Sequence, residues 1–137
     1  MASQEQINAL SQEFLDKYYV DLRDSVSTNP GTQATAIVGL RARYDDSSTF
    51  SWEKETFTGG EDILGKIGSL RQEGNFERSS FSAQLRDTIL IILATGILTP
   101  NNSTLGMNYT ECFVINVSRN DSGFQFNVLN QVGKLAL

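Results

Sequence analysis

The chain has 137 residues, of which 39% are hydrophobic, and this is enough to form one core and hence a single domain over residues 1–137. Its net charge of −5 disfavours direct binding to nucleic acid or to an anionic membrane, because both carry negative charge. The sequence contains no histidine, which excludes a Ser-His-Asp triad, a histidine metal site and a histidine general base.

The sequence also offers no motif for a metal or a cofactor. The acidic pairs Asp45-Asp46 and Glu61-Asp62 have no further ligands at regular spacing, and Gly59-Gly60 leads into no phosphate-binding loop. The longest apolar run, residues 89–94, is too short to span a bilayer, and the first residues do not resemble a signal peptide. We therefore expect a protein of the cytoplasm and nucleus without cofactor or membrane contact, in which Cys112 is a buried free thiol.

The chain is predicted to open with a long amphipathic helix. Ser3 and Gln6 fit a capping box, in which each side chain satisfies a backbone N–H at the start of the helix. Glu13 and Lys17 stand four residues apart on the polar side, and we expect them to form an ion pair. Apolar residues recur every three or four positions and should face the core: Ile7, Leu10, Phe14, Tyr18 and Leu22.

A loop and a hairpin are predicted next. Ser25–Gly31 contains Asn29-Pro30-Gly31 and predicts a loop, after which the apolar residues between 34 and 40 indicate a second, short helix. Residues 49–52 and 55–58 then predict two short strands, with Glu53-Lys54 at the tip of the hairpin.

A third helix is predicted after Gly59-Gly60, with apolar residues at helical spacing from Ile63 to Leu70. Gly65 and Gly68 lie inside this helix, and each costs roughly 1 kcal/mol of helix stability relative to alanine. We expect close packing of the helix on a sheet to account for both glycines.

From Phe76 onward the hydrophobic period changes to two, which predicts a run of antiparallel strands. Residues 88–98 are nearly all apolar at their start, as in a strand that is buried on both faces. Thr99–Leu105 and Arg119–Gly123 predict turns. Helices followed by a long meander form an α+β pattern, and we expect a curved antiparallel sheet to wrap around the first helix.

Three motifs occur in an order that resembles the nuclear transport factor 2 family. They are the tyrosine pair Tyr18-Tyr19 at the end of the first helix, the run from Phe50 to Ile63 with the only tryptophan followed by an acid, and the ending Lys134-Leu135-Ala136-Leu137. The resemblance covers residues 6–137. It implies the cone-like fold of that family and a binding module without enzymatic activity, a class that includes transport adaptors.

The resemblance also implies two partner contacts. In the family, the tryptophan borders a hydrophobic cavity that takes an aromatic side chain of GDP-bound Ran, and the neighbouring acid pairs with a Ran lysine. Trp52 and Glu53 hold these positions here, and Ile7 replaces the tryptophan associated with phenylalanine-glycine nucleoporins. The alternative is that Trp52 belongs to the core and Glu53 is a solvated hairpin tip.

Two departures from the family pattern bear on the partner. The turn that carries two Ran-binding acids in the family reads Pro100-Asn101-Asn102-Ser103 here, without an acid, and Val132-Gly133 replaces an apolar-phenylalanine pair. Two adaptor functions therefore stay open. One is an import carrier for Ran-GDP that binds nucleoporins, and the other is the small subunit of an mRNA export receptor, which pairs with a larger homologous domain.

Relatives pair through the open face of the sheet, so the resemblance implies a homodimer or a heterodimer at the nuclear envelope. Apolar residues of the last two strands are the candidates for this face: Tyr109, Phe113, Phe124, Phe126 and Val128. Strand alternation alone does not say which of them face the helices.

One enzymatic alternative stays open, because cone-shaped domains of this kind also include isomerases, dehydratases and cyclases. Its candidate residues for proton transfer are Tyr18, Tyr44, Asp87, Tyr109 and Glu111. A deep pocket that holds an acid of raised pKa would distinguish this function from a binding module.

Overall fold

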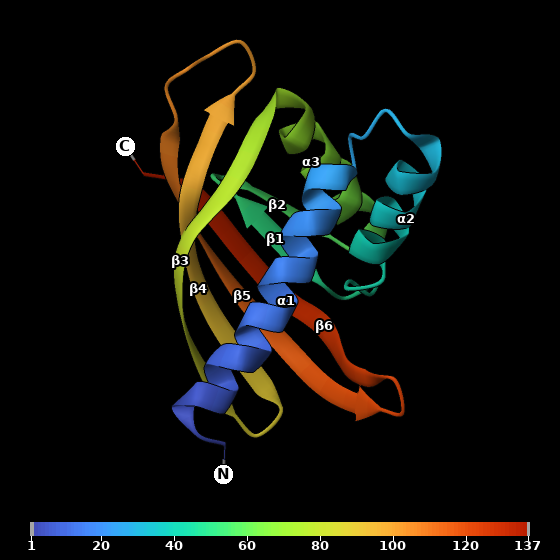
Figure 1. Cartoon of the computed structure of the whole chain (residues 1–137), viewed down its shortest axis with the longest axis vertical. Coiled ribbons are helices and arrows are strands. Elements are labelled where there is room, and N and C mark those ends of the chain that lie inside the picture. Colours follow the sequence, from blue (N-terminus) through green and yellow to red (C-terminus); the bar gives the residue numbers. More distant parts are fainter. Residues whose placement is uncertain (1, 137) are drawn as a thin grey trace.

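The computed structural model describes residues 2–136, which leaves Leu137 of the C-terminal motif outside the described part, and its architecture confirms the α+β prediction. Three helices cover one face of a six-stranded sheet with the order β2-β1-β6-β5-β4-β3 (Figure 1). The elements are α1 (Gln4–Asp24), α2 (Pro30–Arg41), β1 (Thr49–Trp52), β2 (Glu55–Thr58), α3 (Gly60–Glu73), β3 (Gly74–Arg86), β4 (Ile89–Pro100), β5 (Met107–Asn120) and β6 (Gly123–Leu135).

The sheet is mixed, although an antiparallel sheet was expected. β1 runs parallel to β6, with Thr49 opposite Asn130 and Trp52 opposite Gly133, while all other neighbouring strands are antiparallel. The parallel pair joins a short strand between helices to the last strand of the chain, a pairing that no local pattern encodes. The long strands curve around α1 (Figure 1), and bulges in β3 and at the β5–β6 pair add to the bend.

Helix α1 packs its predicted stripe into the concave face of the sheet. The capping box is present, with the Gln6 amide donating to Ser3 Oγ at 3.2 Å and the Ser3 amide donating to Gln6 Oε1 at 2.9 Å. Phe14 is fully buried, and its ring lies 5.2 Å from the ring of Phe113 and 5.4 Å from that of Phe126. The aromatic contacts between helix and sheet therefore make up the centre of the core.

The ion pair expected between Glu13 and Lys17 is not formed. Lys17 Nζ instead contacts Asp21 Oδ1 at 3.0 Å, and Arg43 Nη2 contacts Asp21 Oδ2 at 3.0 Å. Asp21 is 2% exposed. A buried carboxylate relies on a neighbouring cation for its stability far more than an exposed carboxylate does. This pair joins α1 to the end of α2, and Arg43 Nη1 also donates to the carbonyl of Gly39 at 2.7 Å.

Two local predictions need correction and one is confirmed. Helix α2 begins at Pro30, inside the predicted loop, because Asn29 Oδ1 accepts from the Thr32 amide at 3.0 Å and proline suits the first helical turn. Strand β4 is buried on one face only: Leu93 is 48% exposed, whereas Ile92 is fully buried. The hairpin of β1 and β2 forms as predicted, with Glu53 in a left-handed conformation at φ 55°.

Helix α3 differs from the prediction at its two glycines. A Cβ atom added at Gly65 or Gly68 would have no other atom within 4 Å, so no close packing requires either residue. Gly39 on α2 is the opposite case, because a Cβ there would lie 2.5 Å from Asp21 Oδ2.

Over residues 2–136, no helix is long and apolar enough to cross a membrane.

We predict that Gly65→Ala and Gly68→Ala each increase the free energy of unfolding by up to about 1 kcal/mol, because alanine restricts the unfolded chain and meets open space in the folded one. Urea titration followed by circular dichroism measures the change.

Gly39→Ala is the matched control in a second helix. Its methyl group would collide with Asp21, so we expect a loss of about 1–3 kcal/mol. Equal effects of alanine at positions 39 and 65 would contradict this account of the helix packing.

Candidate functional site

A network of buried polar side chains occupies the interior of the cone, where α1, the loop before β1, and strands β5 and β6 converge. Gln131 lies at its centre. Its Nε2 donates to Glu111 Oε2 at 2.8 Å and to the Tyr18 hydroxyl at 3.0 Å, and its Oε1 accepts from the Tyr44 hydroxyl at 2.6 Å. All of these side chains are at most 4% exposed. The sequence patterns indicated Tyr18, Tyr44 and Glu111 as candidates but gave no signal for Gln131.

A pair of tyrosines lies next to this network. The hydroxyls of Tyr19 on α1 and Tyr109 on β5 are 2.7 Å apart, and the guanidinium of Arg78 lies 6.0 Å from the centre of the Tyr19 ring. Burial raises the pKa of Tyr19 and of Tyr109 well above the ordinary tyrosine value. Both hydroxyls are therefore neutral at physiological pH.

Glu111 is the ionisable group that responds to pH in this interior. Burial raises its pKa from 4.5 to about 7, against the lowering effects of the Gln131 amide and the Tyr19 hydroxyl. No lysine or arginine among residues 2–136 forms an ion pair with it. The acid is thus poised between its protonated and ionised forms near neutral pH.

The space beside Glu111 is almost filled. A cavity of about 10 Å³ lies between Glu111 and the side chains of Trp52, Phe76 and Leu70, and it has room for one water molecule. The Trp52 ring packs edge-on to Phe76 with a centroid distance of 6.0 Å. Gly133 makes room for this ring, because a Cβ there would lie 2.7 Å from Trp52 Cε3 and 3.0 Å from Glu111 Cγ.

The structure places Trp52 and Glu53 in structural roles. Trp52 is 5% exposed and belongs to the core, and Glu53 Oε1 accepts a hydrogen bond from the Leu135 amide at 2.8 Å. The Glu53 amide also donates to the Gly133 carbonyl at 3.1 Å. Both residues therefore hold the β1–β2 hairpin against β6. The burial of Trp52 matches the alternative in which it belongs to the core, whereas Glu53 is exposed but bound to β6 rather than a free hairpin tip.

Most of the residues predicted to form the dimer face point towards the helices and not towards the open side of the sheet. Tyr109, Phe113 and Val128 are at most 1% exposed, because these positions of β5 and β6 face the helices. Phe126 is half-buried against Phe14, and Phe124 is 40% exposed near the end of the sheet. These residues are core or border the helical side, so they do not line the open face.

The open face of the sheet, which we call the outer face, carries other apolar side chains. Leu93, Cys112 and Val132 lie opposite one another across β4, β5 and β6. Leu93 is 48% and Val132 52% exposed, and Cys112 is half-buried rather than buried as expected. Further exposed aliphatic residues on this face are Ile91 and Ile97.

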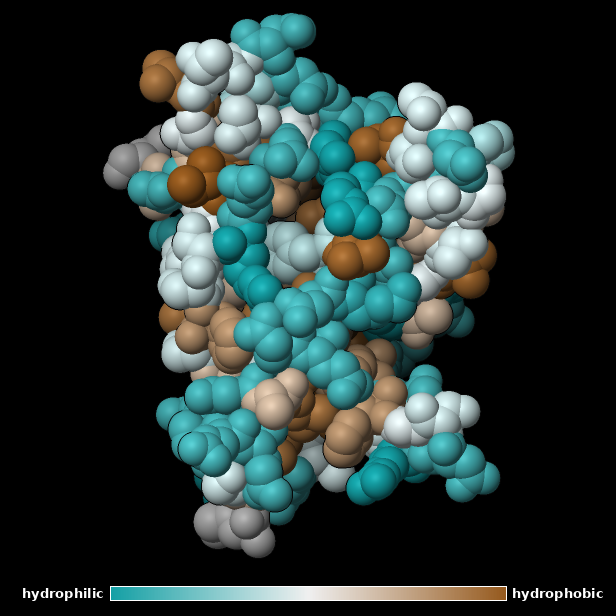
Figure 2. Space-filling model, viewed as in Figure 1, coloured by the Kyte–Doolittle hydropathy of each residue, from teal (hydrophilic) through white to brown (hydrophobic). Residues whose placement is uncertain are grey.

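Ile7 borders an apolar hollow at the start of α1. It lines a space of about 440 Å³ together with Leu10, Leu85 and Phe124, which we call the α1 slot. A second hollow of about 410 Å³ is lined by Phe14, Phe124 and Phe126. Figure 2 shows hydrophobic surface beside the N-terminal half of α1, towards the β5–β6 hairpin. The slot is large enough for an aromatic side chain of a partner.

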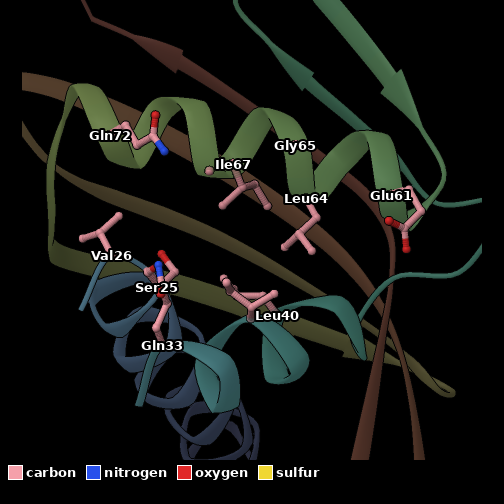
Figure 3. A pocket seen from close by; sticks show the side chains of 11 residues that line it. Ser25, Val26, Gln33, Leu40, Glu61, Leu64, Gly65, Ile67 and Gln72 are labelled. Atoms are coloured by element: carbon pink, nitrogen blue, oxygen red, sulfur yellow. The ribbon is translucent and has the colours of Figure 1, made fainter. Parts of the chain in front are cut away.

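A third hollow, of about 570 Å³, separates α2 from α3. Leu64 and Ile67 point from α3 towards Leu40 of α2, and Glu61 and Gln72 lie at opposite ends of the groove (Figure 3). The Glu61 carboxylate is paired with Arg41 at 2.9 Å. The groove offers an apolar lining without reactive groups.

Asp87, the remaining candidate for proton transfer, lies in the β3–β4 turn at φ 56° and outside the polar network.

Comparison with known proteins identifies the family to which this architecture belongs. A family model described as the nuclear transport factor 2 (NTF2) domain matches residues 10–132. Nuclear transport factor 2 of Cryptosporidium parvum is 21% identical, with a TM-score of 0.71 and 99% of each chain covered. The yeast UBP3-associated protein BRE5 is 16% identical, with a TM-score of 0.63 over 99% of this chain and 98% of that one.

A putative isomerase of the SnoaL-like family from Agrobacterium tumefaciens has the same fold, at 13% identity and a TM-score of 0.58, over 91% of this chain and 96% of that one. A search of curated proteins finds no match. At such identities the structural likeness establishes the fold and leaves the activity open.

We predict that the stability of the protein falls as the pH rises from about 4.5 to about 7 and that Glu111→Gln removes this fall. The folded-state pKa lies above the unfolded value, so the stabilisation is complete below about 4.5 and is lost as the pH rises through about 7. At about 1.4 kcal/mol per pKa unit, the difference is on the order of 2–4 kcal/mol.

Urea titrations at pH 4.5 and pH 8 measure this difference. Glu77→Gln, which neutralises an exposed acid on β3, is the control and should keep the wild-type dependence. A Glu111→Gln variant that loses stability between these pH values as strongly as the wild type would contradict the assignment.

Proposed function

The chain belongs to the nuclear transport factor 2 domain family, and from this premise we propose that it is a non-enzymatic adaptor of nucleocytoplasmic transport that acts as one half of a dimer. The observation that carries the proposal is the filled interior of the cone. The cavity of about 10 Å³ beside Glu111 is far below the roughly 300–1,000 Å³ of typical small-molecule sites. Binding is therefore assigned to the surface of the domain.

The outer face supports the dimer. Leu93, Cys112 and Val132 form an apolar row across its centre, and Ile91 and Ile97 add exposed aliphatic side chains along β4. Exposed apolar side chains that gather on one face of a sheet are typical of a surface that a partner covers. This face takes the place of the residues that the sequence indicated, because those residues pack under the helices.

Between the two adaptor functions, we favour the small subunit of an mRNA export receptor, paired with a larger homologous domain at the nuclear envelope. An aromatic side chain of Ran has no open cavity to enter, since Trp52 fills that space. Glu53 is already bound to the Leu135 amide, and Asn101 and Asn102 stand where acids would meet Ran. The Ran-GDP carrier is the second candidate, supported by the exposed position of Glu53 beside Trp52.

The α1 slot supports a second contact, with phenylalanine-glycine nucleoporins. Ile7, Leu10, Leu85 and Phe124 offer an aliphatic and aromatic lining of the size that a phenylalanine ring fills. The slot lies on the helical side of the sheet, so a partner on the outer face leaves the ring of Phe124 accessible.

An enzyme that moves protons within the cone is the alternative from another class. Glu111, with a pKa of about 7 among neutral tyrosine hydroxyls, is the observation that favours it. It requires a substrate to displace Trp52 from the interior. Protein capture from an extract of the source organism separates these functions. One larger protein with a similar domain, retained in equal amount, would indicate the export-receptor subunit, and Ran with nucleoporins alone would indicate the import carrier. An enzyme is expected to retain neither.

We predict that Leu93→Lys weakens the dimer by roughly tenfold or more, because a charge in the apolar centre of an interface is left without a partner. Sedimentation velocity measures the change in dimer dissociation, and the captured larger domain should be lost from the variant.

Val38→Lys is the control. Val38 is 68% exposed on α2, away from the sheet, so this variant should sediment and capture partners as the wild type does. Identical behaviour of Leu93→Lys and wild type would exclude the outer face as the interface.

We predict that Phe124→Ala lowers the affinity for a phenylalanine-glycine repeat peptide by about tenfold, because it removes the aromatic wall of the α1 slot. Isothermal titration calorimetry with a synthetic repeat measures this. Ile37→Ala, in the α2–α3 groove, should bind the peptide like the wild type. An unchanged affinity of Phe124→Ala would place the nucleoporin contact elsewhere.

A further inference from the structure

We propose that Glu111 and Trp52 form a proton-dependent closure of the cone: the protonated acid keeps the Trp52 ring packed inside, and the ionised acid releases it. This inference concerns regulation of the interior. It does not depend on the identity of the protein partner, and it holds for an adaptor as well as for an enzyme.

Glu111 and Trp52 share a neighbour and a cavity. Glu111 and Trp52 both lie against Gly133, where a Cβ would be 3.0 Å from Glu111 Cγ and 2.8 Å from Trp52 Cζ3. Both also line the same cavity of about 10 Å³. A change in the space that Glu111 requires is therefore transmitted to the indole ring, because well-packed atoms leave no other room.

An ionised Glu111 side chain needs hydrogen-bond donors or water around it. Gln131 Nε2 donates to Glu111 at 2.8 Å and gives its other N–H to Tyr18, and the Tyr19 hydroxyl is the second group that stabilises the carboxylate. An ionised carboxylate can accept about four hydrogen bonds. These two groups and space for one water leave part of this demand unmet, so ionisation favours entry of further water.

Among residues 2–136, no nearby cation compensates the negative charge of an ionised Glu111. Of the titratable groups on the packed elements, Tyr18 and Tyr19 of α1, Tyr44 before β1 and Tyr109 of β5 have pKa values raised by burial and stay neutral. Gln131 of β6 is uncharged, and α3 contributes Ile67 and Leu70 to the cavity wall.

The charged groups on these elements are engaged elsewhere. Arg43, next to Tyr44, pairs with Asp21 at 3.0 Å, and Lys17 of α1 pairs with the same carboxylate. Arg78 of β3 pairs with Asp16 at 2.8 Å and lies over the Tyr19 ring. The charge of Arg78 acts on Tyr109, whose pKa it lowers against the larger raising effect of burial.

Among the residues that line the cavity, Trp52 is the one that we expect to move. It ends the four-residue strand β1, and β2 beyond it forms the edge of the sheet. Phe50 of the same strand also lines the cavity, whereas Tyr18 and Phe76 belong to the long elements α1 and β3. Displacing the end of a short strand breaks fewer contacts than displacing a central helix.

Trp52 is the only tryptophan, so its fluorescence reports the closure directly. The experiment records the emission maximum and acrylamide quenching of the full-length protein between about pH 5 and pH 9. We expect a shift to longer wavelength and stronger quenching above a midpoint near 7. Glu111→Gln should keep the short-wavelength, weakly quenched form at every pH, and Glu77→Gln should keep the transition.

A wild-type signal that does not change over this range would overturn the proposal, and so would an unaltered transition in Glu111→Gln. If that variant does not fold, carbon-13 NMR of the wild-type glutamate carboxyl groups replaces it. A glutamate resonance that titrates with the same midpoint as the Trp52 signal supports the closure, and the lack of any such resonance contradicts it.

Discussion

The side-chain amide of Gln131 is the interaction on which the interior depends. It connects β6 to Tyr18 on α1, to Tyr44 before β1 and to Glu111 on β5. Every one of these groups is buried, and each would cost about 1–3 kcal/mol if it lost its hydrogen-bond partner. The network therefore fixes how the first helix, the loop and the last two strands fit together, and it holds an acid inside an otherwise aromatic core.

A single backbone irregularity brings Gln131 to this position. Val128 pairs with Ile115 and Asn130 with Val114, so Leu129 is an extra residue in β6. In a regular strand, alternation would turn residue 130 inward after Val128. The bulge instead turns Gln131 inward and Val132 outward. It thus creates both the centre of the polar network and part of the apolar row on the outer face.

The same arrangement separates two kinds of function that this fold can host. Similar folds occur in a transport factor and in a putative isomerase, so the fold by itself does not decide between binding and catalysis. The contents of the cone support the binding function proposed above. Trp52 fills the space beside Glu111, and its ring fits there because Gly133 has no side chain. Exposed apolar side chains lie on the outer face and along α1. The accessible apolar side chains thus lie on the surface of the domain, as the proposed adaptor requires.

The sequence by itself determined the features that depend on near neighbours. The capping box at Ser3, the stripe of α1, the β1–β2 hairpin and the α+β order follow from spacing within a few residues, and the order of short motifs indicated the family. Tertiary structure alone decided which side of each strand faces the helices, and hence that Tyr109 and Phe113 are core while Leu93 lies on the open face. It also decided that Trp52 is buried and that Gln131 joins Glu111. The reason is physical: a period of two shows which residues share a face, but which face is buried depends on helices and strands far away in the chain, and one bulge exchanges the two faces.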